Sequence, residues 1–456
     1  MYNTKDILEA TGGQSMNSGH KGVFSHISTD TRKIEKGSLF IAVKGPNFDG
    51  HDFIGEAARK GAAGAVVSRD VPSPEAGFSV ILVKDTVKAL GGIAKFHRSR
   101  FDIPVIALTG SNGKTTTKDM LALILSAKYK VLKNEGTENN FIGVPLTLLK
   151  LNERDEIAVI ELGTNHPGEI GYLADIIQPN CGMILNAGPS HLEFFGSVDN
   201  VRKEKLDLIK RVGEAGSAVV NGDDEMLVIT TRKMCDEVVT FGFNEDCDFT
   251  AGNVRESGCG INFALNDTYL VKLRMLGRHN VQNASAAIAA ASLYGIETKS
   301  AVKALEDFAL PKLRMEYGKC EGIDFIFDCY NSNPASLNSA IVTLRDMEPY
   351  KRKVLVAGDM LELGEAGPEL HREAGRFAAK SKINLLVSVG TLSGYILEGA
   401  QEEGIGGMSL LRFANSVEAA KALKNILKQG DLVLVKGSRG MKMEEIKKCF
   451  TTCSTR

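Results

Sequence analysis

The segment that most constrains the fold is an apolar strand that runs directly into a glycine-containing turn and then into a helix. Its sequence is IPVIALTGSNGKTT, residues 103–116. The glycines allow backbone N–H groups to converge on phosphate oxygens, and the start of the helix adds a favourable dipole. Leu108 stands where the general GxxxxGK[ST] motif has its first glycine, which leaves the shorter GxxGKT. We expect a phosphate-binding loop, with a plain strand-to-helix turn as the alternative, over Gly110, Ser111, Asn112, Gly113, Lys114, Thr115 and Thr116.

Apolar strands that alternate with helices divide the 456 residues into three blocks. In the middle block, DEIAVIELG and CGMILNAG repeat the plan of a short apolar run that stops at polar residues. This pattern is typical of a parallel sheet covered on both faces. The fold class is therefore α/β: a central P-loop-type, mostly parallel sheet flanked by a small N-terminal α/β domain and a C-terminal Rossmann-like domain. The expected boundaries are 1–83, 84–310 and 311–456.

The first and last blocks carry strands of their own. GSLFIAVKG, AGAVVS and SVILVKD predict strands in the first block, with a helix reaching Ala62 between them. FIFDCYNSN, KVLVAGDM, NLLVSVG and DLVLVKGS predict four strands in the last. We expect residues 85–100 to form a connecting helix.

Composition and charge exclude several classes of protein. Lys plus Arg is 55 and Asp plus Glu is 56, so the formal charge of −1 gives no long-range attraction to nucleic acid or anionic membranes. No apolar run approaches the roughly 18 residues of a membrane span, and the N-terminus lacks the apolar region of a signal peptide. The eight Cys show no CxxC or zinc spacing. We expect a cytoplasmic monomer that acts on small molecules, with no membrane span and no nucleic-acid partner.

In parallel sheets, ligands bind at the carboxyl ends of the strands. Glu161 ends the second apolar strand, and Asn186 and His191 follow the third. A carboxylate such as that of Glu161 is costly in this position unless it is paired or binds a metal. Mg²⁺ held between the carboxylate and a nucleotide would satisfy it, as would a nearby Lys or Arg. For His191, a structural role and a ligand role remain equally open.

A lysine interrupts an apolar helix face in residues 198–212. Lys205 shares one stripe, at i, i+4, i+7 and i+11, with Val201, Leu208 and Val212. A lysine that packs inward loses hydration, and its pKa falls toward a reactive neutral amine. Carbon dioxide can carbamylate such an amine into an anionic metal ligand. The alternatives are that Lys205 reaches out to solvent or pairs with Glu161.

Further polar groups follow later strands. Asn280 and Asn283 lie on one side of the first turn of a small-residue helix, where their amides suit the edge of adenine, or simple N-capping. The segments at 328–334, 358–364 and 436–439 face a second crevice by the strand-end rule. There we expect contacts to substrate from Tyr330, Asn331, Lys436, Ser438 and Arg439.

Together these segments resemble the Mur ligase family, the ATP-dependent amide-forming enzymes of peptidoglycan precursor synthesis. TGSNGKTT, ELG, NAGPSHLEFFGS, GRHNVQNASAA, DCYNSNPAS and GDMLELG occur in the family's order and cover essentially the whole chain. NNFIGVPLTLL, DCYNSNP, GDMLELGE and KGSRG are most similar to the members that join D-alanyl-D-alanine to UDP-N-acetylmuramoyl-tripeptide. The resemblance implies three small-molecule substrates, which are ATP, this UDP-sugar peptide and D-Ala-D-Ala.

The resemblance also implies roles for individual residues. Lys114, Lys205 and His191 would be catalytic, and two Mg²⁺ ions would be held by Thr115, Glu161, His191 and a carbamylated Lys205. The family's Lys-Gly-Glu-Ile reads Lys205-Leu206-Asp207-Leu208 here, so Lys203 is a rival position. ATP would also contact Asn280, Asn283, Arg314 and Asp328. Substrate contacts implied by the resemblance are Thr29, Asp30, Thr31, Arg32, Asp49, Gly50, His51, Asn139 and Asn140.

The expected reaction proceeds through an acyl phosphate, formed when the tripeptide carboxylate attacks the γ-phosphate of ATP and consumed by the dipeptide amine. The nearest alternative is a sibling ligase with another amine or acyl substrate, such as a tripeptide-forming ligase, folylpolyglutamate synthetase or a tetrapyrrole-cofactor ligase. A more distant alternative is a P-loop GTPase or a regulatory nucleotide-binding module. The chain contains no Asn-Lys-x-Asp guanine motif, which argues against a GTPase.

Overall fold

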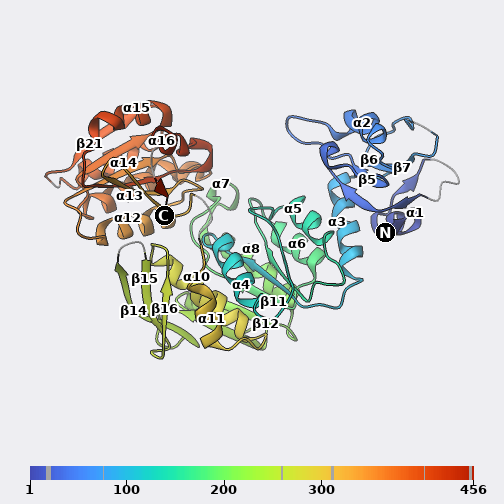
Figure 1. The fold of residues 1–456 in the computed structure, drawn as a ribbon, viewed down its shortest axis with the longest axis horizontal. Helices are drawn as coiled ribbons and strands as arrows, with labels where there is room; N and C mark the ends of the chain where they lie inside the picture. The colour runs from blue at the N-terminus through green and yellow to red at the C-terminus, as the bar shows by residue number, and fades with distance from the viewer. Residues whose placement is uncertain are drawn as a thin grey trace. The chain divides into compact units, whose positions relative to one another are not determined.

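The computed structural model describes residues 1–16, 22–74, 76–257, 260–309, 313–404, 406–450 and 454–455 (Figure 1). They form two compact units. The first consists of Met1–Ala107, Tyr129–Thr164 and Glu169–Asn180, and the second of Leu108–Lys128, Asn165–Gly168 and Cys181–Arg456. The three expected domain boundaries stay predictions, and the one at residues 310 and 311 lies outside the described residues. In the part of the chain that is described, we find no helix with the length and hydropathy of a membrane span.

The first unit opens with a five-stranded sheet in the order β2-β7-β6-β5-β4. Strands β4 to β7 run parallel, and β2 pairs antiparallel with β7. This confirms the three strands expected in the first block. The bounds are β2 (Gln14–Ser15), β4 (His26–Ser28), β5 (Ser38–Ile41), β6 (Gly64–Val67) and β7 (Ser79–Leu82), and a separate antiparallel pair is formed by β1 (Tyr2–Asn3) and β3 (Val23–Phe24).

The helices of this unit follow the expected order with one correction. The connecting helix is α3 (Thr86–Arg98), capped by the Asp85 carboxylate. Helix α2 (Ile54–Arg59) ends before Ala62, because Lys60 caps it and the chain then turns into β6. The remaining elements are α1 (Thr4–Thr11), the 3-10 turns η1 (Thr31–Lys33) and η2 (Gly50–Phe53), α5 (Gly143–Leu148), α6 (Glu169–Ile177), β9 (Val131–Lys133) and β10 (Ile157–Glu161), with β9 and β10 parallel.

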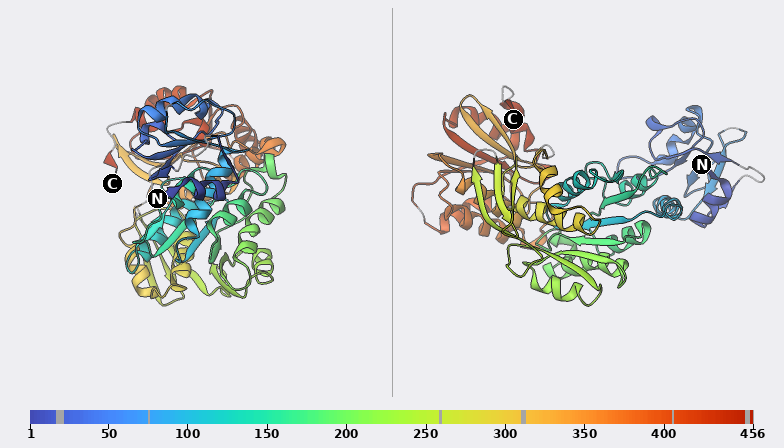
Figure 2. Two further views of the ribbon diagram at one scale, coloured as in Figure 1. Left: turned by 90° about the vertical axis from the view of Figure 1, so that its right-hand side faces the viewer. Right: turned by 60° about the horizontal axis from the view of Figure 1, so that its bottom comes forward.

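The second unit contains most of the central sheet. Strand β8 (Val105–Thr109) ends in this unit, where the backbone N–H of Leu185 donates to the Thr109 carbonyl at 3.0 Å. From β11 the order runs β11-β12-β13-β14-β15-β16. Strands β11 to β14 are parallel, whereas β14 to β16 form antiparallel hairpins that the sequence did not predict (yellow-green in the right view of Figure 2). The bounds are β11 (Cys181–Ile184), β12 (Ser217–Asn221), β13 (Glu237–Gly242), β14 (Phe249–Ser257), β15 (Gly260–Leu265) and β16 (Tyr269–Leu273).

Six helices belong to this part of the second unit. Helix α4 follows β8 directly, as the strand–turn–helix pattern predicts, and α8 spans the residues expected for the lysine-bearing helix. The bounds are α4 (Lys114–Leu125), α7 (Leu192–Phe195), α8 (Val198–Val212), α9 (Glu225–Thr231), α10 (His279–Ser292) and α11 (Thr298–Leu305).

The C-terminal part of the second unit is a doubly wound sheet in the order β21-β20-β19-β22-β18-β17-β23. Strands β18 to β22 pair in parallel, and β17 and β23 add antiparallel edges. The four expected strands are confirmed as β18, β19, β20 and β22. The bounds are β17 (Glu316–Cys320), β18 (Ile323–Asp328), β19 (Arg352–Gly358), β20 (Leu385–Val389), β21 (Ser409–Phe413), β22 (Asp431–Lys436) and β23 (Ser454–Thr455).

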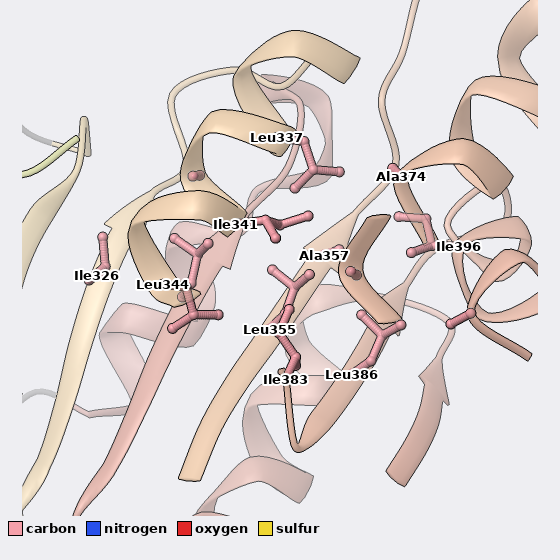
Figure 3. Close-up of a cluster of buried hydrophobic side chains, with 14 of the residues drawn as sticks. Ile326, Leu337, Ile341, Leu344, Leu355, Ala357, Ala374, Ile383, Leu386 and Ile396 are labelled. Carbon is pink, nitrogen blue, oxygen red and sulfur yellow. The ribbon is translucent and has the colours of Figure 1, made fainter. Parts of the chain in front are cut away.

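Alternating side chains of these strands build two cores, one on each face, which is why the strands are apolar throughout. On one face, Leu337 and Ile341 of α12 pack against Leu355 of β19 (Figure 3). On the other face, Val354 packs with Leu423 of α15. The helices are α12 (Pro334–Asp346), α13 (Gly367–Ala379), α14 (Gly394–Glu402), α15 (Ser416–Ile426) and α16 (Glu444–Cys449), with 3-10 turns η3 (Gly364–Ala366) and η4 (Arg439–Met441).

Candidate functional site

The predicted phosphate loop lies between β8 and α4, with Gly113 as the N-cap of the helix. Gly113 has φ +83°, and a Cβ atom there would lie 2.2 Å from Asn283 Oδ1, so both backbone conformation and space require glycine. The Lys114 ammonium turns back onto its own loop and donates to the Gly110 carbonyl at 2.6 Å. The loop therefore has the form of a phosphate cradle, with its lysine at the centre.

The loop after β11 holds this cradle in place. Asn186 Oδ1 accepts from the Asn112 backbone N–H at 2.9 Å, and Asn186 Nδ2 donates to the Asn112 carbonyl at 3.1 Å. The Ser111 hydroxyl lies 2.9 Å from both the Gly188 carbonyl and the Ser190 hydroxyl. The residues just before His191 are thus tied to the phosphate loop.

Lys205 is buried on α8, as its apolar stripe predicts, with 1% of its surface exposed. Burial, with a smaller contribution from the positive charge of Lys114, lowers the pKa of Lys205 from 10.5 to about 7. Lys203, the rival position, is exposed. The structure therefore favours Lys205 as the reactive amine.

Glu204, beside Lys205, is a buried carboxylate that the sequence did not single out. Its Oε2 atom accepts from the Gly168 backbone N–H at 2.7 Å. Its negative charge opposes the fall in the pKa of Lys205.

In the first unit, Glu161 ends β10 and is 1% exposed. Asn139 Nδ2 donates to Glu161 Oε1 at 2.7 Å. The Asn134 side-chain amide accepts from the Glu161 backbone N–H and donates to the Glu161 carbonyl. Asn139 was expected to contact substrate, and here it supports the carboxylate. Asn140 Oδ1 accepts from the backbone N–H groups of Ile142 and Gly143, and Asn140 lines an open cavity of about 570 Å³ along residues 135–146.

His191 meets a glutamate from the C-terminal part of the same unit. His191 Nδ1 lies 2.5 Å from Glu362 Oε2, and this hydrogen bond holds the pKa of Glu362 below its usual range. Because a carboxylate only accepts, Nδ1 must carry the proton. In the neutral ring, Nε2 then keeps a lone pair, as a metal ligand requires.

Two further contacts join the C-terminal part to the phosphate loop. Arg314 Nη2 donates to Thr115 Oγ1 at 3.1 Å, and its guanidinium lies 4.1 Å from the centre of the Tyr330 ring. Asn112 and Asn333 bond each other through both amides, at 2.9 and 3.4 Å. Arg314 therefore lies beside the hydroxyl that is expected to bind a metal, and its expected contact with ATP stays a prediction.

The expected adenine pair is connected internally. Asn283 Nδ2 donates to Asn280 Oδ1 at 3.0 Å, and Asn280 Nδ2 donates to the Leu276 carbonyl at 2.7 Å. Both side chains are buried. The Oδ1 atom of Asn283 faces Gly113, so this pair lies against the phosphate loop.

Several expected substrate contacts of the last block bond to one another instead. Lys436 Nζ donates to Asp328 Oδ2 at 2.5 Å and to the Asn331 carbonyl at 3.0 Å. The Ser438 hydroxyl accepts from the Leu361 backbone N–H at 2.9 Å. These groups shape the strand-end loops. Arg439 is exposed and pairs with Glu444 at 3.1 Å.

In the first unit, the expected UDP-sugar loops follow the parallel strands β4 and β5 and so lie at one edge of that sheet. Thr29 and Asp30 follow β4, and the Arg32 side chain bonds Asp30 and lowers its pKa to about 2. Thr31 donates to Glu56 at 3.0 Å.

The second of these loops is held by its own histidine. His51 donates from Nδ1 to Asp49 Oδ1 at 2.6 Å and accepts at Nε2 from the Ser68 backbone N–H at 2.9 Å. Both ring nitrogens are engaged, so His51 orders the loop around Gly50 rather than offering a free nitrogen.

The site residues that sequence reasoning missed are Asn333, Glu362, His371, Ser190 and Glu204. DCYNSNP and GDMLELG marked two of their segments, but nothing in those segments says which side chain crosses to the phosphate loop. Glu204 carries no sequence signal, because a polar residue beside a motif is ordinary, whereas Ser190 lies within the segment NAGPSHLEFFGS but was not singled out there.

Comparisons with known proteins cover nearly all of the chain. Sequence models described as Mur ligase family, catalytic domain, Mur ligase middle domain and Mur ligase, glutamate ligase domain match residues 23–98, 108–291 and 313–439. The UDP-N-acetylmuramoyl-tripeptide–D-alanyl-D-alanine ligase of Bacillus subtilis is 38% identical over 449 residues, 97% of each chain. The structure of MurF from Acinetobacter baumannii aligns with TM-score 0.90 and 33% identity over 99% of each chain. MurF from Thermotoga maritima in complex with ADP aligns with TM-score 0.84 and 28% identity over 94% of this chain and 97% of that one.

Proposed function

The chain belongs to the Mur ligase family, and we propose that it is the ATP-dependent ligase that joins D-alanyl-D-alanine to UDP-N-acetylmuramoyl-tripeptide. The observation that carries the proposal is the 38% identity over 97% of the chain to a relative with this printed activity. A sibling ligase with another substrate would have to be equally similar to this relative along its whole length. A GTPase or a regulatory module is not supported, because the matched domains are those of amide-forming ligases.

The nucleotide would bind at the phosphate loop. Lys114 lies over the loop, and Arg314 reaches Thr115 from the C-terminal part, so two cations face the place where phosphates would sit. The similar Thermotoga maritima protein was solved with ADP, which supports nucleotide binding by this chain.

A metal would be held by mixed donors. Among the described residues, no group of three or more His, Cys, Asp or Glu side chains is arranged to hold an ion. The donors expected from the sequence are the Thr115 hydroxyl, the Nε2 atom of His191, the Glu161 carboxylate and a carbamate on Lys205, and the oxygen atoms among them suit Mg²⁺ together with phosphate oxygens. When bound, Mg²⁺ would neutralise charge on the transferred phosphoryl group.

Lys205 is chemically suited to carbamylation. Its pKa of about 7 leaves roughly half of the amines neutral at pH 7, and only the neutral amine attacks carbon dioxide. The new C–N bond forms as the amine loses a proton, and the product is an anion beside Lys114. The buried ammonium of Lys205 would thereby become an anionic metal ligand, and the positive charge of Lys114 would stabilise that anion.

The reaction would begin when the tripeptide carboxylate attacks the γ-phosphorus of ATP and displaces ADP, with Lys114 and Arg314 offsetting the repulsion between two anions. The amine of D-Ala-D-Ala would then attack the acyl phosphate and release phosphate. Because an acyl phosphate is labile in water, the C-terminal domain would cover the site during both steps. The loops at Asp30–Arg32 and Asp49–His51 would hold the UDP-sugar.

The test is phosphate release by the purified full-length chain with ATP, UDP-MurNAc-tripeptide and D-Ala-D-Ala, and with each omitted in turn. We expect release only with all three, and a pentapeptide product by mass spectrometry. Release with a single amino acid in place of the dipeptide, or with a folate acyl acceptor, would identify a sibling activity instead. The cytoplasmic location and monomeric state expected from the sequence stay predictions.

A further inference from the structure

The loop between β19 and η3 presents one carboxylate to His191. This loop, residues 359–364, is anchored by Met360 and Leu363, which are buried in the core of the C-terminal part. The side chain between them, Glu362, stays about half exposed and points to His191. The loop is therefore held at its two buried side chains and presents a polar side chain to His191.

The loop backbone is held from two sides. The Met360 N–H donates to Nε2 of the buried His371 at 3.0 Å, and the Leu361 N–H donates to the Ser438 hydroxyl at 2.9 Å. His371 in turn bonds the Gly367 carbonyl at 2.6 Å through Nδ1. Side chains from two further segments thus fix the conformation in which Glu362 is displayed.

Both partners of the contact have unusual backbone conformations. His191 has φ +52° and Glu362 has φ +63°, a region that costs a non-glycine residue about 1–2 kcal/mol. Gly364 permits the approach, because a Cβ atom there would lie 3.0 Å from the Glu193 Cα atom. The Glu193 N–H also donates to the Glu362 carbonyl at 3.3 Å. Both residues joined by this hydrogen bond thus have a strained backbone, which indicates that the contact itself serves a purpose.

We propose that Glu362 is a positioning residue for the ligase reaction: it fixes the tautomer and orientation of His191, so that Nε2 would be available to bind a metal ion. Because Glu362 belongs to the C-terminal part, metal affinity at His191 then depends on docking of that part. This inference rests on the proposed function, in which His191 is a metal ligand. Outer carboxylates that orient a ligating histidine change metal affinity by roughly 10–100-fold.

The first experiment needs no metal. Histidine is labelled with ¹⁵N in the full-length chain, and the ring nitrogens of His191 are assigned by comparison with His191→Ala. We expect the wild type to show a protonated Nδ1 and an unprotonated Nε2. Glu362→Ala should lose this preference, whereas Glu362→Gln should keep it, because the amide oxygen still accepts. The matched control is Glu365→Ala, which removes an exposed carboxylate three residues away.

The second experiment measures Mn²⁺ affinity by electron paramagnetic resonance at saturating ADP. We expect Glu362→Ala to weaken binding at least tenfold, with Glu362→Gln and Glu365→Ala within about threefold of the wild type. A Glu362→Ala protein with the tautomer and Mn²⁺ affinity of Glu365→Ala would overturn the inference. If His191→Ala itself leaves Mn²⁺ affinity unchanged, the metal assignment of the proposed function fails instead.

Discussion

Burial of the Lys205 amine predicts that this residue lowers the free energy of unfolding, although the proposed ligase reaction requires it. A pKa that falls from 10.5 in the unfolded chain to about 7 in the folded one means that the unfolded state binds more protons between these values. Stability should therefore rise with pH through this range. The shift corresponds to a cost of ~4 kcal/mol at pH 7 and ~2 kcal/mol at pH 9.

Lys205→Met keeps the length of the side chain and removes the charge. We expect the variant to be more stable than the wild type by up to ~4 kcal/mol at pH 7, equivalent to a rise in Tm of roughly 8 °C, with the gap halved at pH 9. The same variant should lose ligase activity. The control is Lys203→Met, which changes an exposed lysine on the same helix and should move neither quantity.

The assay is calorimetry in carbon-dioxide-free buffer at pH 7 and pH 9, repeated with bicarbonate. Bicarbonate should raise the Tm of the wild type and of Lys203→Met, which both keep the buried Lys205 amine, but not the Tm of Lys205→Met. A Lys205→Met protein that melts below the wild type at pH 7, or a gap between them that does not shrink at pH 9, would refute the reasoning about its buried charge. Full ligase activity of Lys205→Met would refute the proposal that a carbamate on Lys205 acts in the reaction.

Three further predictions follow from single contacts. Gly113→Ala should abolish binding of a fluorescent ADP analogue while the fold persists, because its methyl group would collide with Asn283 Oδ1; unchanged affinity would contradict this. In a double-mutant cycle, Asn112→Ala and Asn333→Ala should show a coupling of about 1 kcal/mol in kcat/KM for ATP, and additive effects would exclude their pairing during catalysis. Burial lowers the pKa of His371 below 6.5, so the free energy of unfolding should fall as the pH drops below that value. His371→Leu leaves two backbone groups without a hydrogen-bond partner, so it should lower the free energy of unfolding by about 1–3 kcal/mol. Urea titrations at several pH values should also show a weaker pH dependence for this variant than for the wild type.

Much of the site could be predicted because it consists of local patterns. The phosphate loop follows from an apolar run, a glycine turn and a helix start, all within residues 103–116. The choice of Lys205 over Lys203 follows from helical periodicity, and the structure buries one and exposes the other. The antiparallel strands β14 to β16 were missed, since their alternation of polar and apolar residues is weaker than the continuous apolar runs of the parallel strands.

The amino-acid sequence alone determined the parallel strands it predicted and the helices at the phosphate loop and at Lys205, because these depend on side-chain periodicity and allowed backbone angles among near neighbours. Only the tertiary structure decided which polar groups meet. Glu362 reaches His191 across 171 positions, and Asn333 reaches Asn112 across 221. Such pairs depend on how whole sheets and helices pack, and a short polar loop carries no periodicity from which its distant partner could be read.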